Sequence, residues 1–149
     1  MPVPMIHDVQ FREEAKKRVK VLTPQTRRQW GKMSVDQMLW HVNCALENAL
    51  GRYPITPLRL PLPKFLLKFV VITLPWRKGN TPTAPEFLAA ASHDFERERG
   101  RMLALLDEFG AVPLDAQWGP SALLGPMTGH EWSRLQWKHV DHHLRQFGV

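Results

Sequence analysis

Four segments of this chain repeat apolar residues at the three- and four-residue spacing of an amphipathic helix, and no segment alternates as a strand would. The expected helices cover residues 8–22, 34–51, 83–109 and 128–147. A chain of 149 residues with 44% hydrophobic content is long enough to bury a core between them. We therefore predict an all-α fold, a four-helix bundle in one domain over residues 1–149.

Capping signals indicate where these helices begin. Ser34 with Gln37, and Thr128 with Glu131, have the spacing of a capping box, in which two side chains satisfy backbone amides of the first turn. The sequence Thr83-Ala-Pro-Glu86 has a similar pattern, with proline in the first turn, where a helix tolerates it. These signals predict helix starts near residues 34, 83 and 128.

The link between the second and third expected helices, residues 51–85, holds seven of the thirteen prolines. A link of this length predicts a crossover along the bundle, which would leave those two helices parallel. Inside it, residues 64–72 are expected to form a short helix with Lys64 and Lys68 facing outward.

The same link carries six basic residues and no acidic one, and six equals the formal net charge of the chain. The basic residues are Arg52, Arg59, Lys64, Lys68, Arg77 and Lys78. We interpret the link as a solvated crossover that covers the core. An anionic-ligand site, a membrane contact and a nucleic-acid contact stay open as alternatives.

Composition excludes several classes of protein. A single cysteine allows no internal disulfide and no thiolate cluster for zinc. The N-terminus lacks the charged start and apolar run of a signal peptide. The most apolar stretch, residues 58–74, is too short and too often interrupted by basic residues and proline to span a bilayer. These features predict a cytoplasmic protein without a transmembrane segment.

Histidines are the candidate chemical groups. His139 and His143 lie four residues apart, about one helical turn, so both rings project from one face and could hold one metal ion. His41 lies at the edge of the apolar stripe of the second expected helix and can also face the core. An imidazole buried without a partner is costly, and a metal ion would remove that cost.

Three stretches of the chain resemble the DUF1569 family of the DinB/YfiT-like superfamily. They are residues 30–41, residues 79–87, and residues 125–132 running on to 139–147, of which the last is the most specific. The resemblance implies a four-helix bundle with a long crossover between helices two and three. It also implies a divalent metal held by His41, His139 and His143.

The resemblance further implies a homodimer and a small-molecule substrate, since related families often dimerise and some use low-molecular-weight thiols in transferase or isomerase reactions. One departure concerns Ser121 and Ala122, which stand where similar sequences often carry His-Pro. If that histidine contributes to catalysis, its loss affects the chemistry more than the metal binding.

Three neutral imidazoles suit Zn²⁺ or Ni²⁺ first, with Fe²⁺, Co²⁺ and Mn²⁺ as further candidates. Such a zinc site can lower the pKa of bound water to roughly 7, or deprotonate a thiol. We predict a metal-dependent enzyme, either a hydrolase or a thiol-dependent transferase. The alternatives are a non-catalytic metal- or ligand-binding bundle and a basic nucleic-acid or membrane-surface module, although nucleic acid is not the expected partner.

Protease motifs built on His-x-x-x-His do not fit the last expected helix. Zinc proteases of that kind need glutamate where Val140 or His142 stands here. Gln146 falls on the face of His143, one turn further on, and is a candidate to orient a ligand or bound water. We interpret His142 as an exposed residue, with a proton carrier as the alternative.

The remaining candidates are interpreted as packing residues. Cys44 lies one turn after His41 and is expected to be small and buried, because no activating group lies near it in sequence. Four tryptophans flank the histidine-bearing segments, and Trp132 among them is a candidate wall of a substrate pocket. These tryptophans are Trp30, Trp40, Trp132 and Trp137.

Overall fold

The computed structural model describes residues 2–52, 55–79 and 91–149, and in these residues it contains helices and no strand. The elements are α1 (Val9–Val21), α2 (Val35–Ala49), α3 (Lys64–Lys68), η1 (Phe69–Thr73), α4 (Phe95–Ala111) and α5 (Gly129–Gln146). The η1 element is a π-helical turn that continues α3. The predicted all-α class is confirmed for this part of the chain.

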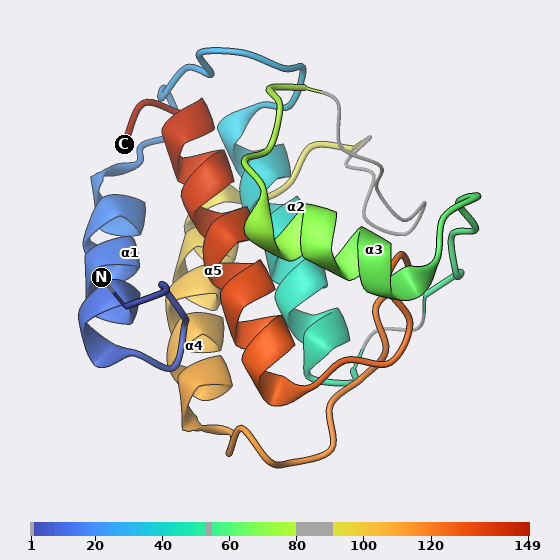
Figure 1. Ribbon diagram of the computed structural model, residues 1–149. Coiled ribbons are helices and arrows are strands. Elements are labelled where there is room, and N and C mark those ends of the chain that lie inside the picture. The colour runs from blue at the N-terminus through green and yellow to red at the C-terminus, as the bar shows by residue number, and fades with distance from the viewer. Residues whose placement is uncertain (1, 53–54, 80–90) are drawn as a thin grey trace.

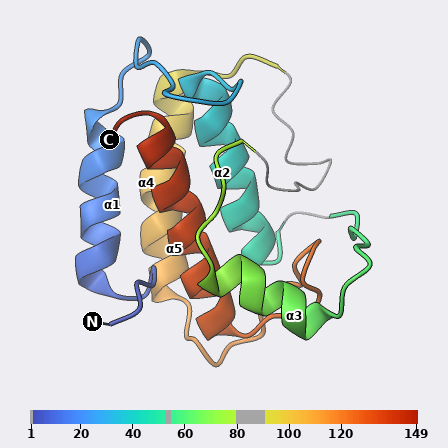
Figure 2. The same cartoon turned by 45° about the horizontal axis from the view of Figure 1, so that its top comes forward.

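The four long helices lie side by side (Figure 1). α2 packs against α4 and α5, and α1 packs against the same two helices. α2 and α4 run in one direction while α1 and α5 run in the other (Figure 2). The long link therefore joins two parallel helices, as its length predicted.

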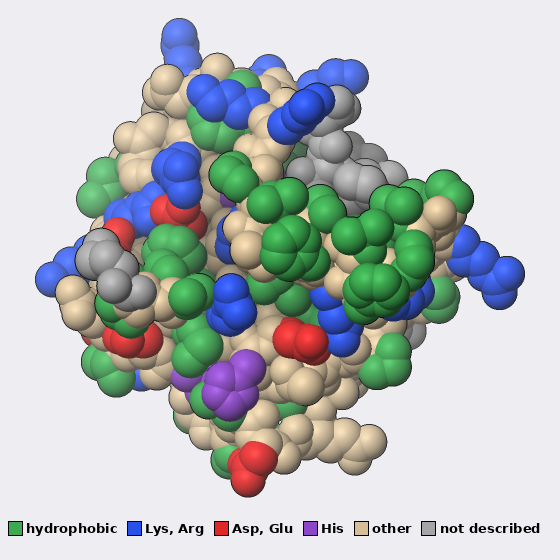
Figure 3. Space-filling view, viewed as in Figure 1, with side chains coloured by type: hydrophobic (Ala, Val, Ile, Leu, Met, Phe, Trp, Pro, Cys, Tyr) green, Lys and Arg blue, Asp and Glu red, His purple; other side chains and the backbone are tan. Residues whose placement is uncertain are grey.

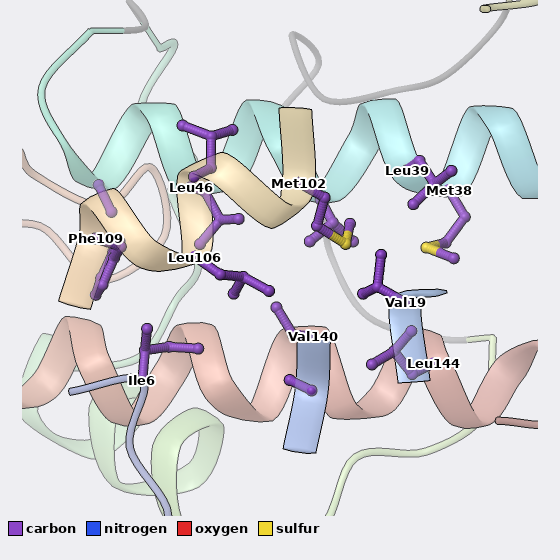
Figure 4. Close-up of a cluster of buried hydrophobic side chains, with 14 of the residues drawn as sticks. Ile6, Val19, Met38, Leu39, Leu46, Met102, Leu106, Phe109, Val140 and Leu144 are labelled. Carbon is purple, nitrogen blue, oxygen red and sulfur yellow. The ribbon is translucent and has the colours of Figure 1, made fainter. Parts of the chain in front are cut away.

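Apolar side chains from all four long helices meet in the core between them (Figure 4). Burying one such leucine, methionine or phenylalanine contributes about 2 kcal/mol to folding, so the shared stripe fixes which faces of the helices meet. Fully buried members are Val19, Met38, Leu39, Leu46, Met102, Leu106, Phe109, Val140 and Leu144.

The predicted starts of α2 and α5 are confirmed. The backbone N–H of Ser34 donates to the side-chain oxygen of Gln37 at 3.0 Å. At α5, the amide of Glu131 donates to the hydroxyl of Thr128 at 3.2 Å, and the amide of Thr128 donates to the Glu131 carboxylate at 2.9 Å. Each box satisfies amides that the first turn would otherwise leave without a partner.

The prediction of one continuous third helix from residue 83 is wrong. The expected start at Thr83 lies outside the described residues, and residues 91–94 are not helical. α4 begins at Phe95 because Asp94 is extended and its carboxylate accepts from the amide of Arg97 at 2.9 Å. The chain just before it is held by α2, where the Asp36 carboxylate accepts from the amide of His93 at 2.8 Å.

The crossover contains the expected short helix, formed by α3 and η1; Lys64 is exposed as predicted, but Lys68 is not. Lys68 turns toward α5 and pairs with Glu131 at 3.0 Å, while Lys64 donates to the backbone oxygen of Leu123 at 2.8 Å. The outermost side chains are instead Phe65 and Phe69, which are 76% and 56% exposed.

Exposed apolar side chains cover the outside of this crossover (Figure 3). We call the group the apolar outer face: Leu60, Leu62, Phe65, Leu66, Phe69, Val70 and Leu74. Among the helices of the described residues, none has the length and apolar character needed to cross a membrane.

Candidate metal centre

α2 and α5 bring His41, His139 and His143 together in space, although 98 residues separate the first two along the chain. The ring centroids are 4.9 Å apart for His41 and His139, 4.9 Å for His41 and His143, and 4.7 Å for His139 and His143. One ring nitrogen from each residue lies within 4.8 Å of those of the other two. The three rings thus form a nearly equilateral triangle.

These distances fit a divalent ion. Ligand nitrogens around a tetrahedral ion with bonds of 2.0–2.1 Å would lie about 3.3 Å apart. The Nε2 atoms of His41 and His139 are 3.0 Å apart, which is close to that value. A hydrogen bond between two neutral rings has the same length, but it joins two rings only. The third ring also converges on these two, which is the arrangement that a shared cation would require.

Two of the rings, those of His139 and His143, are held in the neutral form that a metal needs. His41 and His143 are only 6% and 8% exposed. Burial, and next the neighbouring His41, lower the pKa of His143 to about 3, although the hydrogen bond to Gln146 opposes this. Burial, followed by His143 and His41, holds the pKa of His139 well below its usual value. Near neutral pH these imidazoles therefore keep free lone pairs for a cation.

Gln146 fixes the orientation of one ring. His143 donates from Nδ1 to the Gln146 Oε1 at 2.7 Å, because an amide oxygen can only accept. The Gln146 Nε2 in turn donates to the backbone oxygen of Trp30 at 3.0 Å. With the proton on Nδ1, the lone pair of His143 lies on Nε2, the nitrogen available to a metal.

A glycine makes room for this support. Gly31 has a φ of 83°, and a Cβ built on it would lie 2.4 Å from the Gln146 Nε2. The position therefore needs a residue without a side chain, both for its backbone conformation and for its closeness to Gln146. Sequence reasoning did not single out Gly31, and only its position directly after Trp30 gave a signal.

The family model of DUF1569, described as a protein of unknown function, matches residues 6–148 and so includes all three histidines. The chain belongs to the DUF1569 family. Comparison of this DUF1569 protein with curated proteins and with solved structures finds no match. Its function must therefore be argued from the geometry of the site.

His142 is not the exposed residue that the sequence suggested, since it is half-buried in this DUF1569 protein. Its ring lies edge-on to those of His143, Trp30 and Trp76, with centroid distances of 5.1, 5.8 and 5.4 Å. Burial, followed by Arg145, lowers the pKa of His142. The side chain is thus a neutral contact of the histidine cluster.

Two other predicted residues belong to apolar clusters. Cys44 is buried with Ala45 and Ala122 in a small separate cluster, as expected of a packing residue. Trp132 is 2% exposed, belongs to the main core and donates from its indole to the backbone oxygen of Gly119 at 2.6 Å. The interpretation of Trp132 as a packing residue is therefore confirmed, and it is not among the described residues that line the pocket beside the histidine cluster.

A pocket of about 150 Å³ lies beside the histidine cluster of the DUF1569 protein. We call it the tryptophan pocket, and its lining is Trp30, Pro75, Trp76, Lys78, Lys138, His142 and Arg145. Trp76 is 5.9 Å from His139, ring centre to ring centre, and donates from its indole to the Val71 carbonyl at 2.8 Å. Sequence reasoning missed Trp76, and its place between Pro75 and a basic pair was the available signal.

Proposed function

We propose that this DUF1569 protein is a metal-dependent enzyme with a DinB-like four-helix bundle, in which His41, His139 and His143 hold a divalent ion. The expected ion is Zn²⁺ or Ni²⁺, and the reaction is a hydrolysis or the transfer of a low-molecular-weight thiol. The observation that carries the proposal is the convergence of three imidazoles from two helices, of which those of His41 and His143 are buried and that of His139 is partly buried. When bound, such an ion supplies a Lewis acid that activates water or a thiol.

The number of ligands favours chemistry over a purely structural ion. Structural zinc sites usually have four protein ligands, whereas catalytic sites have three and an open position. Among the described residues, the cluster able to hold an ion consists of these three histidines. The parallel course of α2 and α4 and the long crossover between them support the DinB-like arrangement.

The residues around the ligands have separable roles. Burial keeps the imidazoles of His139 and His143 uncharged, so a cation does not have to displace protons near neutral pH. Gln146 holds the ring of His143 in one orientation. Trp76 and His142 cover part of the cluster on the side of the tryptophan pocket, where they limit the approach of solvent.

Elemental analysis of purified protein tests the metal, with His139→Ala as the decisive variant. We expect about one divalent ion per chain in the wild-type protein and a loss of at least tenfold in affinity for the variant. His130→Ala is the matched control, because His130 is an exposed histidine on the same helix. A wild-type chain that binds no divalent ion, or equal binding by both variants, would refute the metal site.

Activity needs a separate measurement. A panel of thiol conjugates and esters is assayed with and without added metal, using the same two variants. We expect turnover that requires metal, disappears in His139→Ala and persists in His130→Ala. Turnover that His139→Ala leaves unchanged would exclude a catalytic role for the ion.

The apolar outer face favours a second function, attachment to an anionic membrane surface. Phe65 and Phe69 lie one helical turn apart and are the two most exposed members of the face. Residues 55–79 contain no acidic residue, and their basic residues can meet anionic headgroups. Lys68 is paired with Glu131 and Lys78 lines the tryptophan pocket, so the basic residues that can do this are the exposed Arg59, Lys64 and Arg77. A symmetric pairing of two copies through this face would instead bring like charges together.

Vesicle sedimentation tests this attachment. We expect binding to vesicles containing phosphatidylserine, weak binding to pure phosphatidylcholine, and a loss of at least tenfold for Phe65→Ser with Phe69→Ser. Val9→Ser with Val21→Ser is the control, because both valines are exposed apolar residues on α1. The wild type could instead form a dimer and bind no vesicles, with the phenylalanine variant monomeric. That outcome would show that the face serves self-association.

A further inference from the structure

We infer that the tryptophan pocket binds a small molecule that carries an anionic group beside a flat apolar ring. Its walls supply both features. The indole rings of Trp30 and Trp76 lie within 5.8 and 5.4 Å of the ring of His142, centre to centre, so aromatic surface forms the interior of the pocket. Flat apolar groups pack well on such surfaces.

The charge of the lining selects an anion. Lys78, Lys138 and Arg145 line the pocket, and the described residues of its lining include no aspartate or glutamate. Arg145 is partly neutralised, because its Nε donates to the carboxylate of Asp141 at 2.8 Å. Lys138 holds the crossover by donating to the backbone oxygens of Val71 and Leu74.

Lys78 is the cation best placed to meet a ligand. Its Nζ lies 4.6 Å from the centre of the Trp30 ring, on the wall of the pocket. It takes part in no ion pair among the described residues. An anionic group beside the Trp30 ring would therefore gain a charge-assisted hydrogen bond without breaking an existing pair.

The size of the pocket limits the ligand to about one ring. Its volume is about 150 Å³, comparable to cavities that accommodate benzene. An aromatic carboxylate or an aryl phosphate of one ring has the required size, flat surface and charge. Both share one chemistry, a single ring with an anionic substituent.

The pocket adjoins the candidate metal centre. His142 and Trp76, which line it, contact the rings of His143 and His139 at 5.1 and 5.9 Å. A bound molecule would thus lie against the histidine cluster. Its role as the anionic part of the substrate rests on the proposed function, whereas its binding to the pocket does not.

Titration calorimetry tests the inference with benzoate, phenyl phosphate and the neutral benzamide, on zinc-loaded and on chelator-treated protein. We expect saturable binding of at least one of the two anions, with benzamide at least about tenfold weaker. The stronger anion then shows whether a carboxylate or a phosphate is preferred. We expect this binding to persist after removal of the metal.

Two lysine variants separate local from general electrostatics. Lys78→Gln should weaken anion binding about tenfold. Lys20→Gln, which removes an exposed lysine of α1, should leave it unchanged. Equal loss in both variants, benzamide binding as tight as benzoate, or no saturable binding of either anion would overturn the inference.

The two proposals fail separately. If the protein binds an anion but no metal, the pocket inference is supported and the proposed metal-dependent function is refuted. A protein that binds the metal but neither anion would overturn the pocket inference and leave the proposed metal site unaffected. Anion binding that requires metal and is unaffected by Lys78→Gln would place the ligand on the ion and overturn the pocket.

Discussion

The Nδ1 of His143 donates to the Oε1 of Gln146 at 2.7 Å, and this contact decides which nitrogen of the ring a metal can use. Gln146 is itself fixed by its bond to the backbone of Trp30. A side chain that touches no metal thus controls the geometry of the proposed centre.

Replacing Gln146 with leucine should weaken metal binding. The variant keeps a side chain of similar size but cannot accept the Nδ1 proton, so the ring of His143 loses its fixed orientation. Loss of such a supporting contact typically lowers metal affinity about 10- to 100-fold. Competition titration with a zinc chelator measures the change. Gln10→Leu, on the exposed surface of α1, is the control, and equal affinities for the two variants would contradict the supporting role.

The stability of the metal-free protein should fall as the pH drops below about 6.5, the ordinary pKa of histidine. Burial holds the pKa of His143 at about 3 and that of His139 well below its usual value. Below pH 6.5 these two histidines therefore become protonated in the unfolded chain but stay neutral in the folded chain. The free energy of unfolding should fall by up to about 1.4 kcal/mol per pH unit for each of these histidines.

Urea unfolding of chelator-treated protein at about pH 7, 6 and 5 measures this slope. His143→Leu removes one of the titrating rings, so its slope should be shallower than that of the wild type. His130→Leu is the control, because it removes an exposed histidine of the same helix that lies outside the cluster. Stability that stays constant over this range would show that the rings are not buried in the neutral form.

Local spacing predicted the half of the site that lies on one helix. The four-residue interval between His139 and His143 fixes their common face whatever else the chain does, and Gln146 follows on the same face one turn later. The contact between His41 and His139 depends instead on how α2 packs against α5. No spacing within one helix contains that information, and the resemblance to a family supplied it.

The burial of His142 and the start of α4 could not be predicted either, because both depend on contacts between segments far apart in the sequence. His142 reads as exposed on its own helix, but Trp30 and Trp76 reach it from two separate links and leave it half-buried. α4 begins at Phe95 because Asp94 caps it, while Thr83-Ala-Pro-Glu86 offers an equally good local signal. Capping patterns show where a helix can begin, whereas the contact between Asp36 and His93, which holds the chain just before α4, depends on tertiary packing.

Gly31→Ala should reduce metal affinity as well as stability. The left-handed backbone of Gly31 penalises any side chain by about 1–2 kcal/mol, and its Cβ would also displace Gln146. Gly51 offers a matched control, since it has a φ of 78° with nothing within 4 Å of the added Cβ. We expect similar destabilisation of the two metal-free variants and weaker zinc binding in Gly31→Ala alone. Unchanged zinc affinity in that variant would show that Gln146 can move without consequence.

Bound metal should stabilise the fold by joining α2 to α5. A ligand that binds only the folded state adds about 2.7 kcal/mol at one hundred times its dissociation constant, and the ion would bind residues from both helices. The thermal midpoint of wild-type protein should therefore rise with zinc and fall again on chelation. His41→Ala leaves the ligand pair of α5 intact but breaks its connection to α2, so its midpoint should respond little to zinc. Calorimetry with His130→Ala as the responsive control measures the difference, and an equally large zinc response in His41→Ala would remove His41 from the set of ligands.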